Sequence, residues 1–217
     1  MLKKLSILIM ALFLFLLSAC GQQEATFYEL SFEQDKILLI DDNEPFSGIY
    51  AEYYDSEHKF PKSMITVKDG VMEGEFYHYY PDGKLREKGT NRNGMYYGYH
   101  TLYWKNGNIK QKFFINRDKS GYNYEYYENG KLREMLHYNA KAQLDGKSFT
   151  FYPNGRVRDE MNYRNGEREG LFITKDKSGF LVKIFEYRDN ALQAPARKHD
   201  LSDHERFSAT NTMYYHF

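Results

Sequence analysis

Cysteine is almost absent from this chain of 217 residues, whose one cysteine is Cys20. A single cysteine forms neither an internal disulfide nor a zinc site built from several thiolates. The sequence also lacks H-E-x-x-H, G-x-S-x-G and the phosphate-binding loop G-x-x-x-x-G-K-S/T. These absences argue against the common metalloproteases, hydrolases and nucleotide-binding enzymes, and we predict a non-enzymatic protein without a cofactor.

The remaining acidic and histidine residues do not group into a catalytic or metal site. Four carboxylates stand beside Arg or Lys at repeated positions: Glu87, Glu134, Asp159 and Glu160. This pattern favours solvated ion pairs between neighbouring strands over a pair of catalytic acids. His78 and His100 occupy equivalent strand positions, but no third ligand recurs with them, so we predict no metal site.

A strong charge of either sign is missing as well. The chain has 30 Lys and Arg and 30 Asp and Glu, so its formal net charge is +0. Loss of Lys3 and Lys4 with an N-terminal signal leaves 28 basic and 30 acidic residues, a net charge of −2. A balanced charge provides no field that attracts nucleic acid, and none is expected as a partner.

Long hydrophobic runs are limited to the N-terminus, where Leu5 to Leu17 is apolar apart from Ser6. This run is shorter than the roughly 20 residues that a membrane-spanning helix needs. Lys3 and Lys4 precede the run, and small residues follow it, which is typical of an export signal. We therefore predict that residues 1–19 are a signal peptide.

The end of this signal, Leu17-Ser18-Ala19-Cys20, resembles the lipobox of bacterial lipoproteins. The resemblance implies cleavage before Cys20 and lipidation of Cys20, which makes the membrane a partner of the mature chain. The alternative is an ordinary secretory signal with a cysteine there by chance. Gly21 is not the acidic residue that retains some lipoproteins on the inner membrane, so we expect a lipoprotein of the cell envelope, in the outer membrane if the organism has one.

Aromatic residues, in contrast, make up 18% of the chain, and many belong to one recurring phrase. The phrase appears as YYPDGKLRE (79–87), YWKNGNIKQ (103–111), YYENGKLRE (126–134) and FYPNGRVRD (151–159). Glycines repeat with it at positions 48, 74, 98, 121, 146 and 170, about 24 residues apart. A fixed period of this length indicates stacked structural repeats, each of which cannot fold alone.

Each repeat predicts a β-hairpin with two distinct faces. Pro81-Asp82-Gly83 favours a three-residue turn, which places Tyr79 opposite Leu85 and His78 opposite Arg86. Alternation then gives a predicted core face with Tyr79, Tyr103, Tyr126 and Phe151 against Leu85, Ile109, Leu132 and Val157. The opposite face carries an aromatic and basic row: Tyr80, Trp104, Tyr127, Tyr152, Arg86, Lys110, Arg133 and Arg158.

The units G-x-x-x-x-[YF]-[YW]-x-[ND]-G-x-[LIV]-[RK]-[EQD] resemble the variant MORN repeat of bacterial proteins, in particular the YwqK-type antitoxins of toxin–antitoxin systems. The resemblance implies an all-β fold: an elongated antiparallel meander or open solenoid of successive hairpins. We expect six repeats of about 24 residues in 44–190, after a lipid anchor, tether and N-terminal edge strands in 20–43. Residues 191–217 are expected to be a C-terminal tail or cap.

Two functions remain compatible with the sequence. The first is a lipid-anchored protein-interaction module, antitoxin-like or immunity-like if its partner is a toxin, which binds through the aromatic and basic row. The alternative is a glycan-binding or peptidoglycan-binding lipoprotein that uses the same aromatics. The row has a purely structural interpretation too, because Arg stacked on Tyr can hold neighbouring repeats together.

Overall fold

A computed structural model describes residues 23–33, 36–116 and 118–193. The predicted signal peptide and Cys20 lie outside the described residues, as does the predicted tail beyond residue 193. The described elements are β1 (Glu24–Thr26), η1 (Phe27–Glu29), β2 (Leu30–Glu33), β3 (Lys36–Leu39), β4 (Gly48–Tyr53), β5 (Pro61–Lys68), β6 (Val71–Tyr79), β7 (Leu85–Arg92), β8 (Met95–Tyr103), β9 (Ile109–Ile115), β10 (Gly121–Tyr126), β11 (Leu132–Tyr138), β12 (Gly146–Phe151), β13 (Val157–Arg164), β14 (Glu167–Arg168), β15 (Gly170–Lys175), β16 (Leu181–Arg188) and β17 (Ala191–Leu192).

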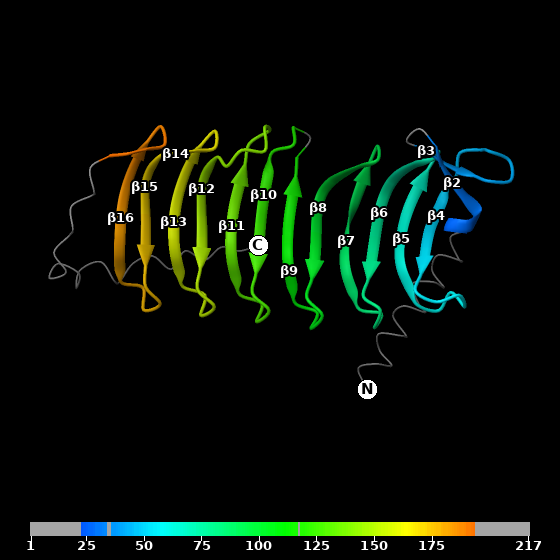
Figure 1. Cartoon of the computed structure of the whole chain (residues 1–217), viewed down its shortest axis with the longest axis horizontal. Helices are drawn as coiled ribbons and strands as arrows, with labels where there is room; N and C mark the ends of the chain where they lie inside the picture. The colour runs from blue at the N-terminus through cyan, green and yellow to red at the C-terminus, as the bar shows by residue number, and fades with distance from the viewer. Residues whose placement is uncertain (1–22, 34–35, 117, 194–217) are drawn as a thin grey trace.

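Fifteen of these strands form one long sheet in which chain neighbours pair almost throughout. The strands from β4 onward run antiparallel, whereas β1 adds to β4 in parallel at the N-terminal edge. Figure 1 shows the strands side by side in a single elongated row that does not close on itself. The predicted all-β fold, an elongated antiparallel series of hairpins, is confirmed.

The repeated hairpin turn has the predicted three-residue form. The Gly83 amide donates to the Tyr80 carbonyl over 2.9 Å, and the Tyr80 amide donates to the Lys84 carbonyl over 2.8 Å. Gly83 has φ of 78°, a left-handed conformation that glycine adopts without steric cost. The same pair of bonds recurs at Gly107, Gly130, Gly155 and Gly179.

The register differs from the prediction one residue beyond the turn. Tyr79 lies opposite Leu85 as expected, but His78 lies opposite Glu87, so the predicted pairing of His78 with Arg86 is wrong. Arg86 is the extra residue of a β-bulge, in which two residues of one strand face one residue of the other. The bulge recurs in every hairpin of the repeat region, at Lys62, Arg86, Lys110, Arg133, Arg158 and Val182.

The bulge and the strand alternation define two faces of the sheet. We call the face with Tyr79, Tyr103, Tyr126 and Phe151 the open face, and the face with Tyr80, Trp104, Tyr127 and Tyr152 the ladder face. The cross-strand pairs assign each of the remaining strand residues to one of these two faces, because side chains that lie directly opposite each other point to the same side of the sheet.

The apolar core lies at the N-terminal end of the sheet. Its cluster of buried residues is Ala25, Leu30, Ile37, Phe46, Tyr50 and Val67. The hairpin β2–β3 supplies Leu30 and Ile37, and it packs on the ladder face of β4 and β5. Beyond Phe76, the described part of the chain has no buried hydrophobic residue, so the remaining hairpins form a single layer with half-buried faces.

The predicted core face is therefore wrong. Tyr79, Tyr103, Tyr126 and Phe151 are only partly buried, and no second layer of described strands covers them. The buried side chains of the middle units are polar: Thr101 lies on the open face, and the others lie on the ladder face, namely Asn91, His100, Ser148 and Thr150. A single-layer sheet buries side chains against their neighbours in the same face rather than against a second layer.

Gly89 shows how tightly the ladder face is packed. The His100 ring is completely buried and lies 4.8 Å from the Phe76 ring and 4.7 Å from the Phe113 ring, measured between centroids. A Cβ atom at Gly89 would lie 2.5 Å from Nε2 of His100 and 2.7 Å from the Phe76 ring. The absence of a side chain at Gly89 is thus what makes room for the His100 ring.

We expect Gly89→Ala to destabilise the fold by about 1–3 kcal/mol, because the added methyl group overpacks this site. Thermal or urea unfolding measures the change. Lys88→Ala, at the exposed neighbouring position, is the matched control and should change stability by less than about 0.5 kcal/mol. Equal stability of Gly89→Ala and the parent would contradict the packing described here.

Candidate functional site

The eight residues of the predicted aromatic and basic row fall into two structural groups. The four aromatic residues lie just before the turns and are half-buried on the ladder face. The four cations occupy the bulge positions and are exposed. The bulge, which the sequence reasoning missed, separates the cations of the row from its aromatic residues.

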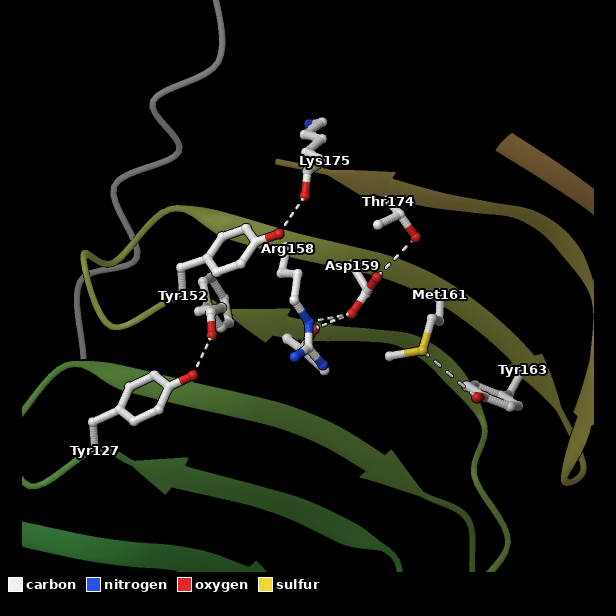
Figure 2. Close-up of polar contacts among 10 residues, drawn as sticks. Tyr127, Tyr152, Arg158, Asp159, Met161, Tyr163, Thr174 and Lys175 are labelled. Carbon is white, nitrogen blue, oxygen red and sulfur yellow. Dashed lines mark hydrogen bonds and ion pairs between the residues drawn. The ribbon is translucent and has the colours of Figure 1, made fainter. Parts of the chain in front are cut away.

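Each aromatic side chain donates a hydrogen bond to the backbone of the next repeat. Tyr80 Oη donates to the Tyr103 carbonyl over 2.8 Å, and Trp104 Nε1 donates to the Tyr126 carbonyl over 3.2 Å. Tyr127 Oη donates to the Phe151 carbonyl over 2.7 Å, and Tyr152 Oη donates to the Lys175 carbonyl over 2.9 Å. Figure 2 shows the last two bonds, with each ring pointing toward the next hairpin. The aromatic half of the row therefore joins repeat to repeat.

Tyr54 makes the same bond, from its Oη to the Tyr79 carbonyl over 2.9 Å. The sequence prediction left Tyr54 out because Glu57 replaces the turn glycine of the first unit. The adjacent pair Tyr53-Tyr54 was the signal that could have found it. In the sixth unit Asp176 stands at this position, and its carboxylate accepts from the amides of Ser178 and Phe180 instead. This ladder, Tyr54 to Tyr152, therefore ends at the sixth hairpin.

The turns form a second set of bonds between repeats. The side-chain amides of Asn106, Asn129 and Asn154 each donate to a carbonyl of the next turn, over 2.9–3.0 Å. The same asparagines accept, through Oδ1, the amide of the residue two positions later. Asp82 cannot donate, but Lys84 Nζ reaches the Lys105 carbonyl over 2.8 Å, as Lys131 Nζ reaches the Asn154 carbonyl one pair of repeats later. Asn in the turn is thus explained by a hydrogen bond between repeats as well as by turn chemistry, and Asp82 by turn chemistry alone.

The bulge cations make weak ionic and ring contacts with the ladder face. Lys110 Nζ lies 5.0 Å from the centre of the Trp104 ring, an exposed cation–π contact. Arg133 lies 3.5 Å from Glu125, and its side chain remains 57% exposed. Ion pairs at such exposed positions contribute little to stability. These cations are therefore available at the surface at little structural cost.

Arg158 is held more firmly, in the network of Figure 2. Its Nε donates to Asp159 over 2.7 Å, and the hydroxyls of Thr150 and Thr174 donate to the same carboxylate over 2.6 and 2.9 Å. Burial by itself would raise the pKa of Asp159, but these hydrogen bonds outweigh burial and lower it. Asp159 is therefore a structural acceptor that stays ionised.

Glu134 has the opposite tendency. It lies directly opposite Glu125 in the pairing of β10 with β11, on the ladder face. Burial raises the pKa of Glu134, and the Glu125 charge raises it further, although Arg133 and Arg158 act against this rise. Asp159 and Glu134 occupy equivalent strand positions, but their pKa values shift in opposite directions. Asp159 accepts three hydrogen bonds, whereas Glu134 faces a like charge.

The described residues offer no arrangement suited to catalysis by a metal. Within residues 23–33, 36–116 and 118–193, no group of three or more His, Cys, Asp or Glu could hold a metal ion. Across the same ranges, no helix is long and apolar enough to cross a membrane. What the ladder face offers is a regular surface, with half-buried rings and exposed cations at intervals of one hairpin.

Comparison with known families supports the repeat assignment. Three segments, residues 72–91, 119–140 and 144–165, match the family described as MORN repeat variant. They correspond to the hairpins β6–β7, β10–β11 and β12–β13. Three hairpins thus match the MORN repeat variant, and MORN repeats are in general non-catalytic modules that interact with proteins or membranes.

Other comparisons add no functional information. No curated protein matches the sequence. Among solved structures, alternansucrase in complex with isomaltononaose is similar over 76% of this chain, at 14% identity and a TM-score of 0.15. The chain spans 16% of that protein. So slight a likeness says nothing about fold or function.

We expect Tyr127→Phe to destabilise the fold by about 0.5–1.5 kcal/mol, because it removes one hydrogen bond to a backbone carbonyl and leaves the ring in place. Chemical unfolding measures the change. Tyr122→Phe, which removes the hydroxyl of an exposed tyrosine on the open face, is the matched control. If the two variants are equally stable, the bond from Tyr127 does not hold the repeats together.

Glu134→Gln should stabilise the protein at pH 7 by about 0.2–1 kcal/mol, since it removes a like-charge pair between opposite strands. The folded-state pKa of Glu134 is raised, so its ionised form destabilises the fold above that pKa. The advantage of the variant should shrink as the pH falls through the pKa of Glu134 and vanish below the pKa of the unfolded chain. Melting temperatures between pH 3 and 8 test this, with Glu128→Gln at an exposed turn as control. A variant that is less stable at pH 7 would contradict it.

Proposed function

We propose that this chain is a non-enzymatic envelope protein that binds a protein partner through its repeat sheet. The observation that carries the proposal is the match of three hairpins to a repeat whose members are generally interaction modules. The long sheet supports it, because equivalent side chains return at every hairpin and present an extended surface.

The anchor in this proposal is Cys20. Cleavage after Ala19 and lipidation of Cys20 would tether the mature chain to a membrane, and the short segment before β1 would keep the sheet close to it. In an organism with two membranes, we place the protein in the outer one. The basis is the sequence Leu17-Ser18-Ala19-Cys20-Gly21 alone.

The antitoxin-like form of this function carries a geometric condition. A chain tethered outside the cytoplasm cannot reach a toxin that acts inside it. The proposed immunity role therefore requires a toxin that meets its target in the envelope. A general scaffold, in which the sheet holds any one envelope protein, requires only the tether and the surface.

We place the partner on the ladder face, where Arg86, Lys110 and Arg133 extend from the bulges. Arginine and aromatic residues often contribute most of the binding energy at protein interfaces. The half-buried rings of Tyr80, Trp104, Tyr127 and Tyr152 would form the floor of such an interface, and the cations would make its polar contacts. Arg158 belongs to the same row, but its bond to Asp159 leaves it less available.

The test is capture of the partner from detergent-solubilised envelope by the full-length, Cys20-anchored protein. Arg133→Ala should reduce capture at least about fivefold while stability changes by less than about 1 kcal/mol. Trp104→Ala should lower the melting temperature, because it removes a bond between repeats, and should reduce capture as well. Cys20→Ala should release the protein from the membrane fraction.

Two results would contradict the proposal. An unmodified N-terminus in mass spectra of the mature protein would remove the anchor. Capture of the same partner by the parent and by Arg86→Ala, Lys110→Ala and Arg133→Ala, with equal yield, would remove the ladder face as the binding surface.

A further inference from the structure

The open face, which the sequence reasoning took as the core face, carries a second aromatic surface. Tyr99, Phe114, Tyr122 and His137 lie directly opposite one another across four consecutive strands, β8 to β11. In the next row, Lys112 lies opposite both Thr101 and Tyr124. We call the group Tyr99, Lys112, Phe114, Tyr122 and Tyr124 the aromatic plate.

The rings of the plate contact one another in two pairs, and one ring of each pair is exposed to solvent. The Tyr99 and Phe114 ring centroids are 4.6 Å apart, and those of Tyr122 and Tyr124 are 6.1 Å apart with nearly parallel planes. Tyr99 is 58% exposed and Tyr122 is 42% exposed. Lys112 Nζ lies 4.7 Å from the centre of the Tyr99 ring. Contiguous exposed aromatic surface of this kind often marks a binding site.

The plate contrasts with the ladder face in what its rings do for the fold. On the ladder face, five aromatic side chains each bond to the backbone of the next repeat. Tyr99 and Tyr122 lie within their strands rather than at the turns, where those bonds form. The exposed area of Tyr99 and Tyr122 is therefore not explained by the ladder that holds the repeats together.

Charge is also divided between the two faces. The strands from β7 to β12 contain three carboxylates, Glu87, Glu125 and Glu134, and their cross-strand partners place all three on the ladder face. The open face of the same strands carries Lys88, Arg92, Lys112 and Lys147. Between β7 and β12 the open face thus carries cations and no strand carboxylate, which favours anionic ligands there, while Glu75 of β6 and Glu160 of β13 lie on the same face outside this region.

A shallow hollow adjoins the plate. It has a volume of about 500 Å³ and is lined by Tyr97, Phe114, Ile115, Asn116 and Asp118. Phe114 belongs to both the hollow and the plate, so a ligand that covers the plate can extend into the hollow. Asn116 and Asp118 add polar groups at this end, and a ligand hydroxyl could bond to them.

We propose that the aromatic plate binds an anionic polysaccharide. Flat, exposed rings suit stacking against the apolar face of a sugar ring, while Lys112 and Lys88 suit the acidic groups of the sugar. Protein partners more often insert anchors into well-packed, desolvated pockets, and the plate is instead a flat strand surface. Successive hairpins repeat about every 10 Å, twice the strand spacing, which suits a ligand that is itself a repeating chain.

The proposal does not depend on the protein partner proposed above, because it concerns the opposite face of the sheet. Loss of partner capture in the Arg133→Ala variant and loss of glycan binding in plate variants are separate results. An acidic peptide is the competing ligand for a surface of aromatic rings and lysines. The experiment therefore includes one.

Affinity electrophoresis of the full chain in native gels tests the proposal, with alginate, hyaluronate, dextran or poly-L-glutamate cast into the gel. Alginate or hyaluronate should retard the parent, whereas neutral dextran and poly-L-glutamate should not. The double variant Tyr99→Ala, Tyr122→Ala should bind the retarding polysaccharide about tenfold more weakly while it remains folded at the temperature of the gel. Lys112→Gln should weaken binding and make it less sensitive to salt.

Tyr28→Ala is the matched control, since Tyr28 is 88% exposed but belongs to η1, far from the plate in Figure 1. It should migrate like the parent in every gel. The proposal is overturned if neither acidic polysaccharide retards the parent, or if dextran or poly-L-glutamate retards it equally. Retention of full binding by the Tyr99→Ala, Tyr122→Ala variant would also overturn it.

Discussion

One hydrogen bond between neighbouring repeats, from an aromatic side chain to a backbone carbonyl, underlies the rest of this structure. It occurs five times, from Tyr54 to the Tyr79 carbonyl through to Tyr152 and the Lys175 carbonyl. A single hairpin buries too little surface to be stable in water, and among the described residues no second layer covers the sheet beyond Phe76. Each ring therefore both covers the neighbouring strand and ties down its backbone.

Most of this fold and part of its candidate site could be predicted from the sequence. The glycine spacing predicted the hairpins, and Pro81-Asp82-Gly83 predicted the turn, because a short turn is decided by local chemistry. The bulge at Arg86 was not predictable from alternation. The alternating pattern of the second strand is compatible with the register that includes the extra residue and with the register that does not. The core face was misassigned because both faces carry aromatic residues, so the sequence pattern does not distinguish them. Only the position of β2 and β3 in the structure shows that the ladder face is the one that is covered, at the N-terminal end of the sheet.

The division of the sheet into two faces connects the fold with the proposed functions. The aromatic residues next to the turns bond to the neighbouring repeats, so the cations at the bulges are the exposed groups of the ladder face. Tyr99 and Tyr122 lie within their strands and are exposed on the open face, where the strands β7 to β12 carry lysines and no carboxylate. The same repeat thus produces a ladder face that joins the hairpins and carries exposed cations, and an open face that carries exposed aromatic residues.

The central claim is that these bonds couple each hairpin to the next, and native-state hydrogen exchange of Tyr80→Phe tests it most directly. Tyr80 belongs to the hairpin β6–β7, and its hydroxyl bonds to the Tyr103 carbonyl in the hairpin β8–β9. We predict faster amide exchange in both hairpins, with unchanged protection in the distant pair β15–β16. Faster exchange confined to β6–β7, or no change at all, would contradict the account.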